Sequence, residues 1–508
     1  MALALGFVLR ALPLTAARPY IAYIDEGNFL HPAFRLVRDG GWDPRSYLYP
    51  QLPAMAVVAA ARTVDPIYRS VRGRSLRERI RERVEVYDEL EPFALLFLAR
   101  CMDLALGMAI IVLTGLLAMR LAGPGAGAAA ALVAALIPAL VLRGSIATVD
   151  SYATLFVLAS LYATHRTTTS RRPGFASLLA GALAGAAFAS KYPSVIVLAA
   201  LPVTTFFQPI AGREKLRRLA LAGLGLIAGA ALAMPALLKH PREVYDAILQ
   251  QGTFYRELSS VPLWRQTFLR SEWDLPYDRA ELGFVFVALA VGGLVAGLRD
   301  RRIAPTLWGW CAFAAMALVL YARQPFQPFR NLLPLVPLSC AAIGILYVRV
   351  RERMRRPLGL DAGALLWVAL AFAVPLAAYA VERYRLEDPR KQAIDWLSAR
   401  IRPADEVLVV HELGFLNQEV ERLRAKPTVE WWDRAGSVLL ASRPRFLIGG
   451  VLRHKDGSQA DVAADPVVAA AYALKLQLGM MPTTPEKGWW RENYQIVYVF
   501  ERKDAQGQ

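Results

Sequence analysis

The stretch from Tyr23 to Pro32, which reads YIDEGNFLHP, follows directly after the first apolar segment of the chain. Its adjacent carboxylates, Asp25 and Glu26, stand where a membrane helix would emerge into water. Ionisable groups at a membrane boundary are costly and tend to mark a functional site. A solvated pair of acids at a helix end is the plainer interpretation, so the rest of the chain has to decide between the two.

The composition is that of a membrane protein. The chain has 508 residues, 56% of them hydrophobic, and near-uncharged apolar runs recur along it. Because about 17–25 such residues are needed to cross a bilayer, we predict a polytopic α-helical membrane protein with about eleven transmembrane helices. The predicted spans are 2–17, 93–119, 124–142, 149–165, 174–190, 193–208, 217–237, 281–298, 304–322, 329–348 and 359–381.

The positive charge of the chain is distributed in a way that indicates orientation. The formal net charge is +17, and arginines cluster in alternate short loops between the apolar runs. This pattern suits lipid headgroups and phosphate, and we expect no nucleic-acid partner. By the positive-inside rule the basic loops are cytoplasmic. The outer loop 18–92, the loop 238–280 and the C-terminal region would then lie outside, in a multi-pass protein of the cell (cytoplasmic or inner) membrane.

The composition changes near residue 385. Residues 388–402 have the spacing of an amphipathic helix, and residues 406–410, 445–451 and 494–501 read as strands. Strands alternating with helical stretches predict a small α/β domain. We therefore divide the chain into a membrane module at 1–384 and an extracytoplasmic α/β domain at 385–508.

Four short elements, in order along the chain, resemble those of one family. The first is the Asp25-Glu26 pair with Tyr47-Leu48-Tyr49-Pro50 behind it, and the second joins Arg143 to Asp150. The third, Lys191-Tyr192-Pro193, is similar to a "GLAxxxKYP" element. The fourth, Arg330-Asn331-Leu332-Leu333-Pro334, is similar to an "RYLLPLxP" element, with Asn331 where tyrosine is usual. Over residues 20–340 the chain thus resembles the GT-C membrane glycosyltransferases of the protein-mannosyltransferase and aminoarabinose-transferase type.

The resemblance implies a reaction and roles for particular residues. A sugar would move from a polyprenyl-phosphate-linked donor to an extracytoplasmic acceptor, with inversion. Asp25 would be the general base for the acceptor, and Glu26 and Asp150 would be further catalytic carboxylates. Cations stabilise the charge that develops on the leaving phosphate, and the implied ones are Lys191, Arg330, Arg143 and Arg323. The candidate substrate contacts are His31, Tyr49, Tyr192 and Trp273. Trp273 is included because aromatic faces with charged neighbours in the loop 238–280 suit sugar stacking, although tryptophan is also common at membrane interfaces.

Three of these side chains also have a structural explanation. Asp150 stands at a helix start, where an aspartate is a common N-cap. Lys191 could extend to the membrane interface, and Arg330 could be an interfacial anchor. Gly181 and Gly185, four residues apart before Lys191, predict close packing of one helix against another.

Two other classes of protein stay open. A transporter or flippase of lipid-linked sugars is the main alternative, although it would favour charges on both membrane faces of a central cavity and an internal repeat. We identify candidate site residues on the outer face only, and no repeat. A non-catalytic scaffold is the third. No cofactor is indicated with certainty, a requirement for a divalent metal stays open, and the sequence names neither the sugar nor the acceptor.

Overall fold

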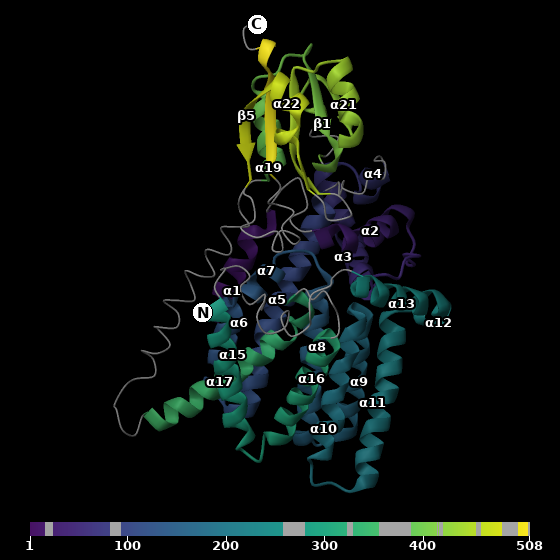
Figure 1. Cartoon of the computed structure of the whole chain (residues 1–508). Coiled ribbons are helices and arrows are strands. Elements are labelled where there is room, and N and C mark those ends of the chain that lie inside the picture. The colour runs from purple at the N-terminus through teal and green to yellow at the C-terminus, as the bar shows by residue number, and fades with distance from the viewer. Residues whose placement is uncertain are drawn as a thin grey trace. The chain divides into compact units, whose positions relative to one another are not determined.

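The computed structural model describes residues 1–15, 24–81, 93–257, 280–322, 329–354, 388–413, 415, 420–453, 459–479 and 496–505. The chain forms two compact units. The first consists of Met1–Leu14, Phe29–Arg81 and Ala94–Arg383, and it contains most of the helices (Figure 1). The second consists of Thr15–Asn28, Glu82–Phe93 and Tyr384–Gln508, and it contains the β-sheet.

Helices account for most of the described chain before residue 355. The α-helices are α1 (Ala2–Ala11), α2 (Ile24–Asp39), α3 (Gln51–Arg72), α4 (Leu76–Arg81), α5 (Phe93–Ala122), α6 (Pro124–Leu136), α7 (Pro138–Arg143), α8 (Val149–Thr169), α9 (Pro173–Ser190), α10 (Ala200–Phe206), α11 (Gly212–Ala233), α12 (Ala236–Lys239), α13 (Pro241–Glu257), α15 (Ala280–Leu298), α16 (Ala304–Ala322) and α17 (Leu335–Met354). Short 3-10 helices are η1 (Leu12–Thr15), η2 (Tyr192–Ala199) and η4 (Phe329–Leu332).

Several of these helices suit a lipid environment. Within the described ranges, four are long and apolar enough to cross a membrane: Ala94–Ala122, Pro173–Ser190, Gly212–Ala233 and Ala304–Tyr321. A helix satisfies its backbone hydrogen bonds internally, which is what a spanning segment requires. The predicted polytopic helical membrane protein is confirmed. The number of eleven spans stays a prediction, and the segment 359–381 lies outside the described residues.

Some predicted spans are interrupted. The segment 124–142 divides into α6 and α7 because Ile137 has extended backbone angles and Pro138 cannot donate a hydrogen bond to the preceding turn. The segment 193–208 begins as the 3-10 helix η2 and becomes α-helical only at Ala200. Hydropathy detects apolar length but not these changes of backbone.

The helices α9 and α11 pack at backbone contact. A Cβ atom on Gly181 would lie 1.9 Å from the carbonyl oxygen of Ala222, and one on Gly225 would lie 2.1 Å from that of Leu178. Only glycine allows helix backbones to approach so closely. The predicted close packing around Gly181 is confirmed, and the helix that carries it ends at Ser190, directly before Lys191.

The second unit contains a six-stranded sheet in the order β2-β1-β3-β6-β5, with β4 paired to β3. The strands are β1 (Glu406–Val410), β2 (Lys426–Glu430), β3 (Phe446–Arg453), β4 (Gln459–Asp461), β5 (Tyr472–Leu478) and β6 (Val497–Arg502), and the helices after residue 388 are α19 (Pro389–Ser398), α21 (Trp432–Ala441) and α22 (Pro466–Ala471). Strands β1, β2 and β3 are parallel, and β6 is antiparallel to both β3 and β5. This confirms the small α/β domain and its three predicted strands, whereas β2, β4 and β5 were not predicted.

Candidate functional site

Lys191 joins three segments that are far apart in the sequence. Its ammonium Nζ donates to Oδ1 of Asp150 at 2.7 Å and to Oδ1 of Asn331 at 2.7 Å. The Lys191 side chain is 16% exposed and that of Asp150 is 3% exposed. Since both side chains are mostly removed from water, each charge compensates a partner that would be costly to bury alone. The end of α9, the start of α8 and the turn before α17 therefore meet at one cation.

Asp150 is not the N-cap of its helix. The N-cap position of α8 is Thr148, and Asp150 is the second residue of the helix, with its carboxylate directed to Lys191. A carboxylate in the first helical turn is also favoured by the helix dipole. The next residue, Ser151, donates its hydroxyl to the backbone carbonyl of Arg143 at 3.1 Å, which ties the end of α7 to this start of α8.

Asn331 was missed by the sequence analysis, although the sequence carried a signal. It lies in η4, is 5% exposed, and occupies the position where the resembling element usually has tyrosine. Its side-chain amide oxygen accepts a hydrogen bond from the Lys191 ammonium, which also donates to Asp150. Arg330 precedes it and is partly buried.

Tyr192 ties the residue after Lys191 to the loop between α2 and α3. Its hydroxyl donates to the backbone carbonyl of Tyr47 at 2.6 Å, and both tyrosines are nearly buried. The hydroxyl of Tyr192 therefore forms a hydrogen bond within the protein and does not face a cavity as a free donor. Tyr49, the predicted substrate contact on the same loop, is partly buried, and it is Tyr47 that faces the neighbouring cavity.

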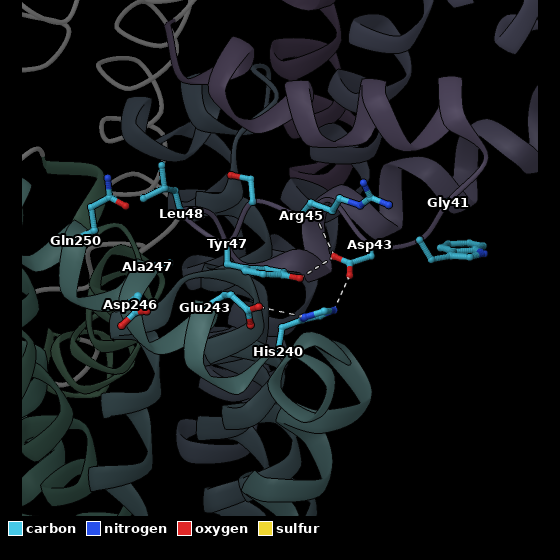
Figure 2. Close-up of a pocket in the computed structure, with 12 residues that line it drawn as sticks. Gly41, Asp43, Arg45, Tyr47, Leu48, His240, Glu243, Asp246, Ala247 and Gln250 are labelled. Carbon is cyan, nitrogen blue, oxygen red and sulfur yellow. Dashed lines mark hydrogen bonds and ion pairs between the residues drawn. The ribbon is translucent and has the colours of Figure 1, made fainter.

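That cavity has a volume of about 820 Å³. It is lined by Gly41, Trp42, Asp43, Arg45, Ser46, Tyr47, Leu48, His240, Glu243, Asp246, Ala247 and Gln250. Figure 2 shows Asp43 at the centre of its polar contacts. The carboxylate of Asp43 accepts from the Tyr47 hydroxyl at 2.9 Å and from the Arg45 amide at 3.1 Å, and His240 Nε2 lies 3.2 Å from it.

The electrostatics of the cavity follow from these contacts. Partial burial opposes ionisation of Asp43, but the Arg45 amide, the Tyr47 hydroxyl and nearby His240 outweigh it and lower the pKa of Asp43. Burial, together with the hydrogen bond to Asp43, raises the pKa of Tyr47 above its ordinary value. At neutral pH the cavity thus holds an ionised aspartate and a protonated tyrosine. His240 also lies 3.4 Å from Glu243 through Nδ1, and its ring stacks on Tyr47 with centroids 6.0 Å apart.

Comparisons with known proteins identify the fold. Residues 94–238 match the family model described as dolichyl-phosphate-mannose-protein mannosyltransferase. The structure of ArnT from Cupriavidus metallidurans bound to undecaprenyl phosphate aligns with a TM-score of 0.56 at 13% identity, over 98% of this chain and 96% of that chain. The chain has the GT-C fold.

A second solved GT-C structure agrees. The archaeal oligosaccharyltransferase AglB from Archaeoglobus fulgidus, in complex with an inhibitory peptide and a dolichol-phosphate, aligns with a TM-score of 0.51 at 11% identity, over 99% of this chain and 88% of that chain. No curated protein matches the sequence. The predicted GT-C fold is therefore confirmed.

The other predicted site residues of this GT-C chain are placed as follows. Asp25 lies in the first turn of α2, and its side chain is outside the described part. Glu26 beside it is 0% exposed, so the interpretation as a solvated acid is wrong for Glu26. His31 is partly buried on the same helix. Trp273 and Arg323 lie outside the described residues. No group of three histidine, cysteine, aspartate or glutamate side chains in the described ranges could hold a metal ion.

Proposed function

We propose that this protein is a membrane glycosyltransferase that moves a sugar from a polyprenyl-phosphate-linked donor to an acceptor outside the cytoplasm. The GT-C fold supports the class of reaction, and two proteins with that fold have been solved with undecaprenyl phosphate or dolichol-phosphate bound. The observation that carries the proposal is the fixed cation, Lys191, held by Asp150 and Asn331 between three helical segments.

Lys191 has the capacity to bind a donor phosphate. An ammonium has three N–H groups, and among the described residues Asp150 and Asn331 accept two of them. We assign the third to a phosphate oxygen of the donor. Arg330, Arg143 and Arg323 are the further cations of the proposed phosphate site, because guanidinium groups bind two oxygens of a phosphate at once.

The reaction follows from these assignments. The acceptor oxygen or nitrogen attacks the anomeric carbon of the sugar from the side opposite the phosphate, which gives inversion. The bond between that carbon and the phosphate oxygen breaks, and the electron pair leaves with the phosphate, where the cations stabilise the charge. The acceptor proton passes to Asp25, which we assign as the general base. Glu26 is buried and next to it, and we assign it a positioning role.

The fold favours this transferase over the alternative, a flippase of lipid-linked sugars, because AglB, a solved structure with this fold, is an oligosaccharyltransferase.

The test uses the full chain, purified into lipid nanodiscs and supplied with a panel of polyprenyl-phosphate sugars. We expect at least one donor to be hydrolysed or transferred. Asp25→Asn cannot accept a proton, so turnover should fall roughly 10²–10⁴-fold while donor binding is kept. Arg330→Ala should weaken donor binding, whereas the control Arg349→Ala, whose partner is Asp300, should not. Binding of no donor by the wild type, or full turnover by Asp25→Asn, would refute the proposal.

A further inference from the structure

We propose that the cavity around Asp43 is the acceptor subsite, and that it takes the carbohydrate part of an acceptor that carries no phosphate there. This inference rests on the proposed function and adds the class of acceptor to it. The cavity lies between the loop 40–50 and the helices α12 and α13, and its volume of about 820 Å³ is in the range of sites for small ligands.

The cavity adjoins the proposed donor site through one residue. The backbone carbonyl of Tyr47 accepts the hydroxyl of Tyr192, the neighbour of Lys191, and the side chain of Tyr47 faces Asp43 in the cavity. Beneath the loop, Tyr47 and Tyr192 pack in one apolar cluster with Ala189, Met234, Ala236, Val244 and Ala247. An acceptor bound in the cavity would thus lie near the end of α9, where Lys191 stands.

The charge of the cavity selects against anions. Its lining has three carboxylates, Asp43, Glu243 and Asp246, against one arginine, Arg45, and one histidine, His240, which lies between Asp43 and Glu243. The lowered pKa of Asp43 keeps that carboxylate ionised at neutral pH. A phosphate group would be repelled here, and it would instead be attracted to Lys191. We therefore place the donor phosphate at Lys191 and the acceptor in the cavity around Asp43.

The remaining side chains suit a sugar. Trp42 lines the cavity and is 48% exposed, while the guanidinium of Arg62 lies 4.0 Å from its ring centroid and steadies it. An exposed aromatic ring presents an apolar face for the C–H groups of a sugar. Glu243 is 59% exposed, and its carboxylate, with Asp246, can accept from sugar hydroxyls or from an amine.

The walls of the cavity are held together before any ligand arrives. The Gln51 side-chain oxygen accepts the backbone N–H of Ala236 at 3.0 Å, and Gln251 donates its side-chain amide to the carbonyl of Leu48. These bonds connect the loop 40–50 and the start of α3 to α12 and α13. A preformed site loses less conformational freedom on binding, which favours a ligand as polar as a carbohydrate.

The test measures glycan binding and donor binding separately on the full chain in nanodiscs of neutral lipid. The probe is an array of neutral, amine-bearing and phosphorylated oligosaccharides. We expect binding to glycans without phosphate, with the dissociation constant raised roughly 10–100-fold in Trp42→Ala and in Asp246→Asn. The matched controls are Tyr245→Ala, which changes a 60% exposed tyrosine of α13 outside the cavity lining, and Asp39→Asn, an exposed acid outside it. Both controls should bind like the wild type.

Three results would overturn the inference: binding of no glycan, binding of phosphorylated glycans alone, or equal binding by Trp42→Ala, Asp246→Asn and the controls. The donor measurement distinguishes the two proposals. If the wild type binds and hydrolyses a polyprenyl-phosphate sugar but shows one of these results, only the acceptor subsite is wrong. If glycans bind as expected but no donor does, the proposed transferase is wrong and a carbohydrate-binding cavity stands.

Discussion

Removing the Lys191 ammonium is expected to destabilise the protein through the carboxylate that it leaves behind. In Lys191→Met the aliphatic part of the side chain is conserved, but Asp150, which is 3% exposed, loses its cation at 2.7 Å. Breaking a buried ion pair on one side costs about 3–5 kcal/mol, because an uncompensated charge stays out of water. Since Lys191 is itself 16% exposed, we expect the lower end, about 3 kcal/mol.

The chain provides a matched control for this variant. Arg349 and Asp300 also lie 2.7 Å apart, but their side chains are 36% and 31% exposed. An exposed pair contributes about 0–1 kcal/mol, so Arg349→Met should cost no more than that. The double variant Lys191→Met, Asp150→Leu removes both charges and should recover most of the lost stability.

The free energy of unfolding would be measured by titrating detergent-solubilised protein with a denaturing detergent and following circular dichroism. A loss of about 3 kcal/mol in Lys191→Met, recovered in the double variant, would establish Lys191 as a buried partner of Asp150. A loss no larger than that of Arg349→Met would refute the reasoning. That result would instead support the alternative that the Lys191 side chain extends to the membrane interface.

Two further predictions concern the helix packing and the orientation. Gly225→Ala places a Cβ atom 2.1 Å from the Leu178 carbonyl oxygen, so it should lower the free energy of unfolding by about 1–3 kcal/mol or prevent α9 and α11 from packing. At Gly223 nothing lies within 4 Å of the added Cβ, so Gly223→Ala should be tolerated. The unfolding titration described above compares the two variants. The alternation of basic loops predicts that the C-terminus lies outside, so a reporter that is active only in the cytoplasm should be silent when fused after Gln508. An active reporter would reverse the assigned orientation.

The sequence predicted those parts of the fold that depend on local pattern. Apolar runs predicted the helices, and the spacing of Gly181 and Gly185 predicted close packing against another helix, because backbone approach depends on the absence of a side chain. The structure shows that this other helix is α11. Strands β1, β3 and β6, which contribute most of the buried sheet, were recognisable as apolar runs. Strands β2 and β5 were not, because they lie at the two edges of the sheet, where polar and apolar residues mix.

The candidate site was harder to predict, since its contacts are long-range. Asp150 and Lys191 were singled out by resemblance, but nothing local indicated that they would bond to each other across 41 residues, or Lys191 to Asn331 across 140. The departure from tyrosine at Asn331 was visible and unexplained until the structure showed a short amide acceptor for the ammonium. His240 and Glu243 attracted no notice, because their relation to Asp43 exists only once α12 and α13 pack beside the loop.

The hydrogen bond from Tyr192 to Tyr47 connects the two proposed subsites in a particular way. Tyr192 follows the residue that would bind the donor phosphate, and Tyr47 contributes its backbone to this bond and its phenol to the cavity. Two further bonds hold this region: Gln251 of α13 donates to the carbonyl of Leu48 in the loop, and Gln51 at the start of α3 accepts from Ala236 of α12. On the proposed assignment, the acceptor therefore meets the donor in a preformed geometry, and the binding energy of the acceptor is not used to order the loop. On that assignment the rate is gained by holding two substrates at a fixed separation, and Tyr47 contributes to it through both its backbone carbonyl and its side chain.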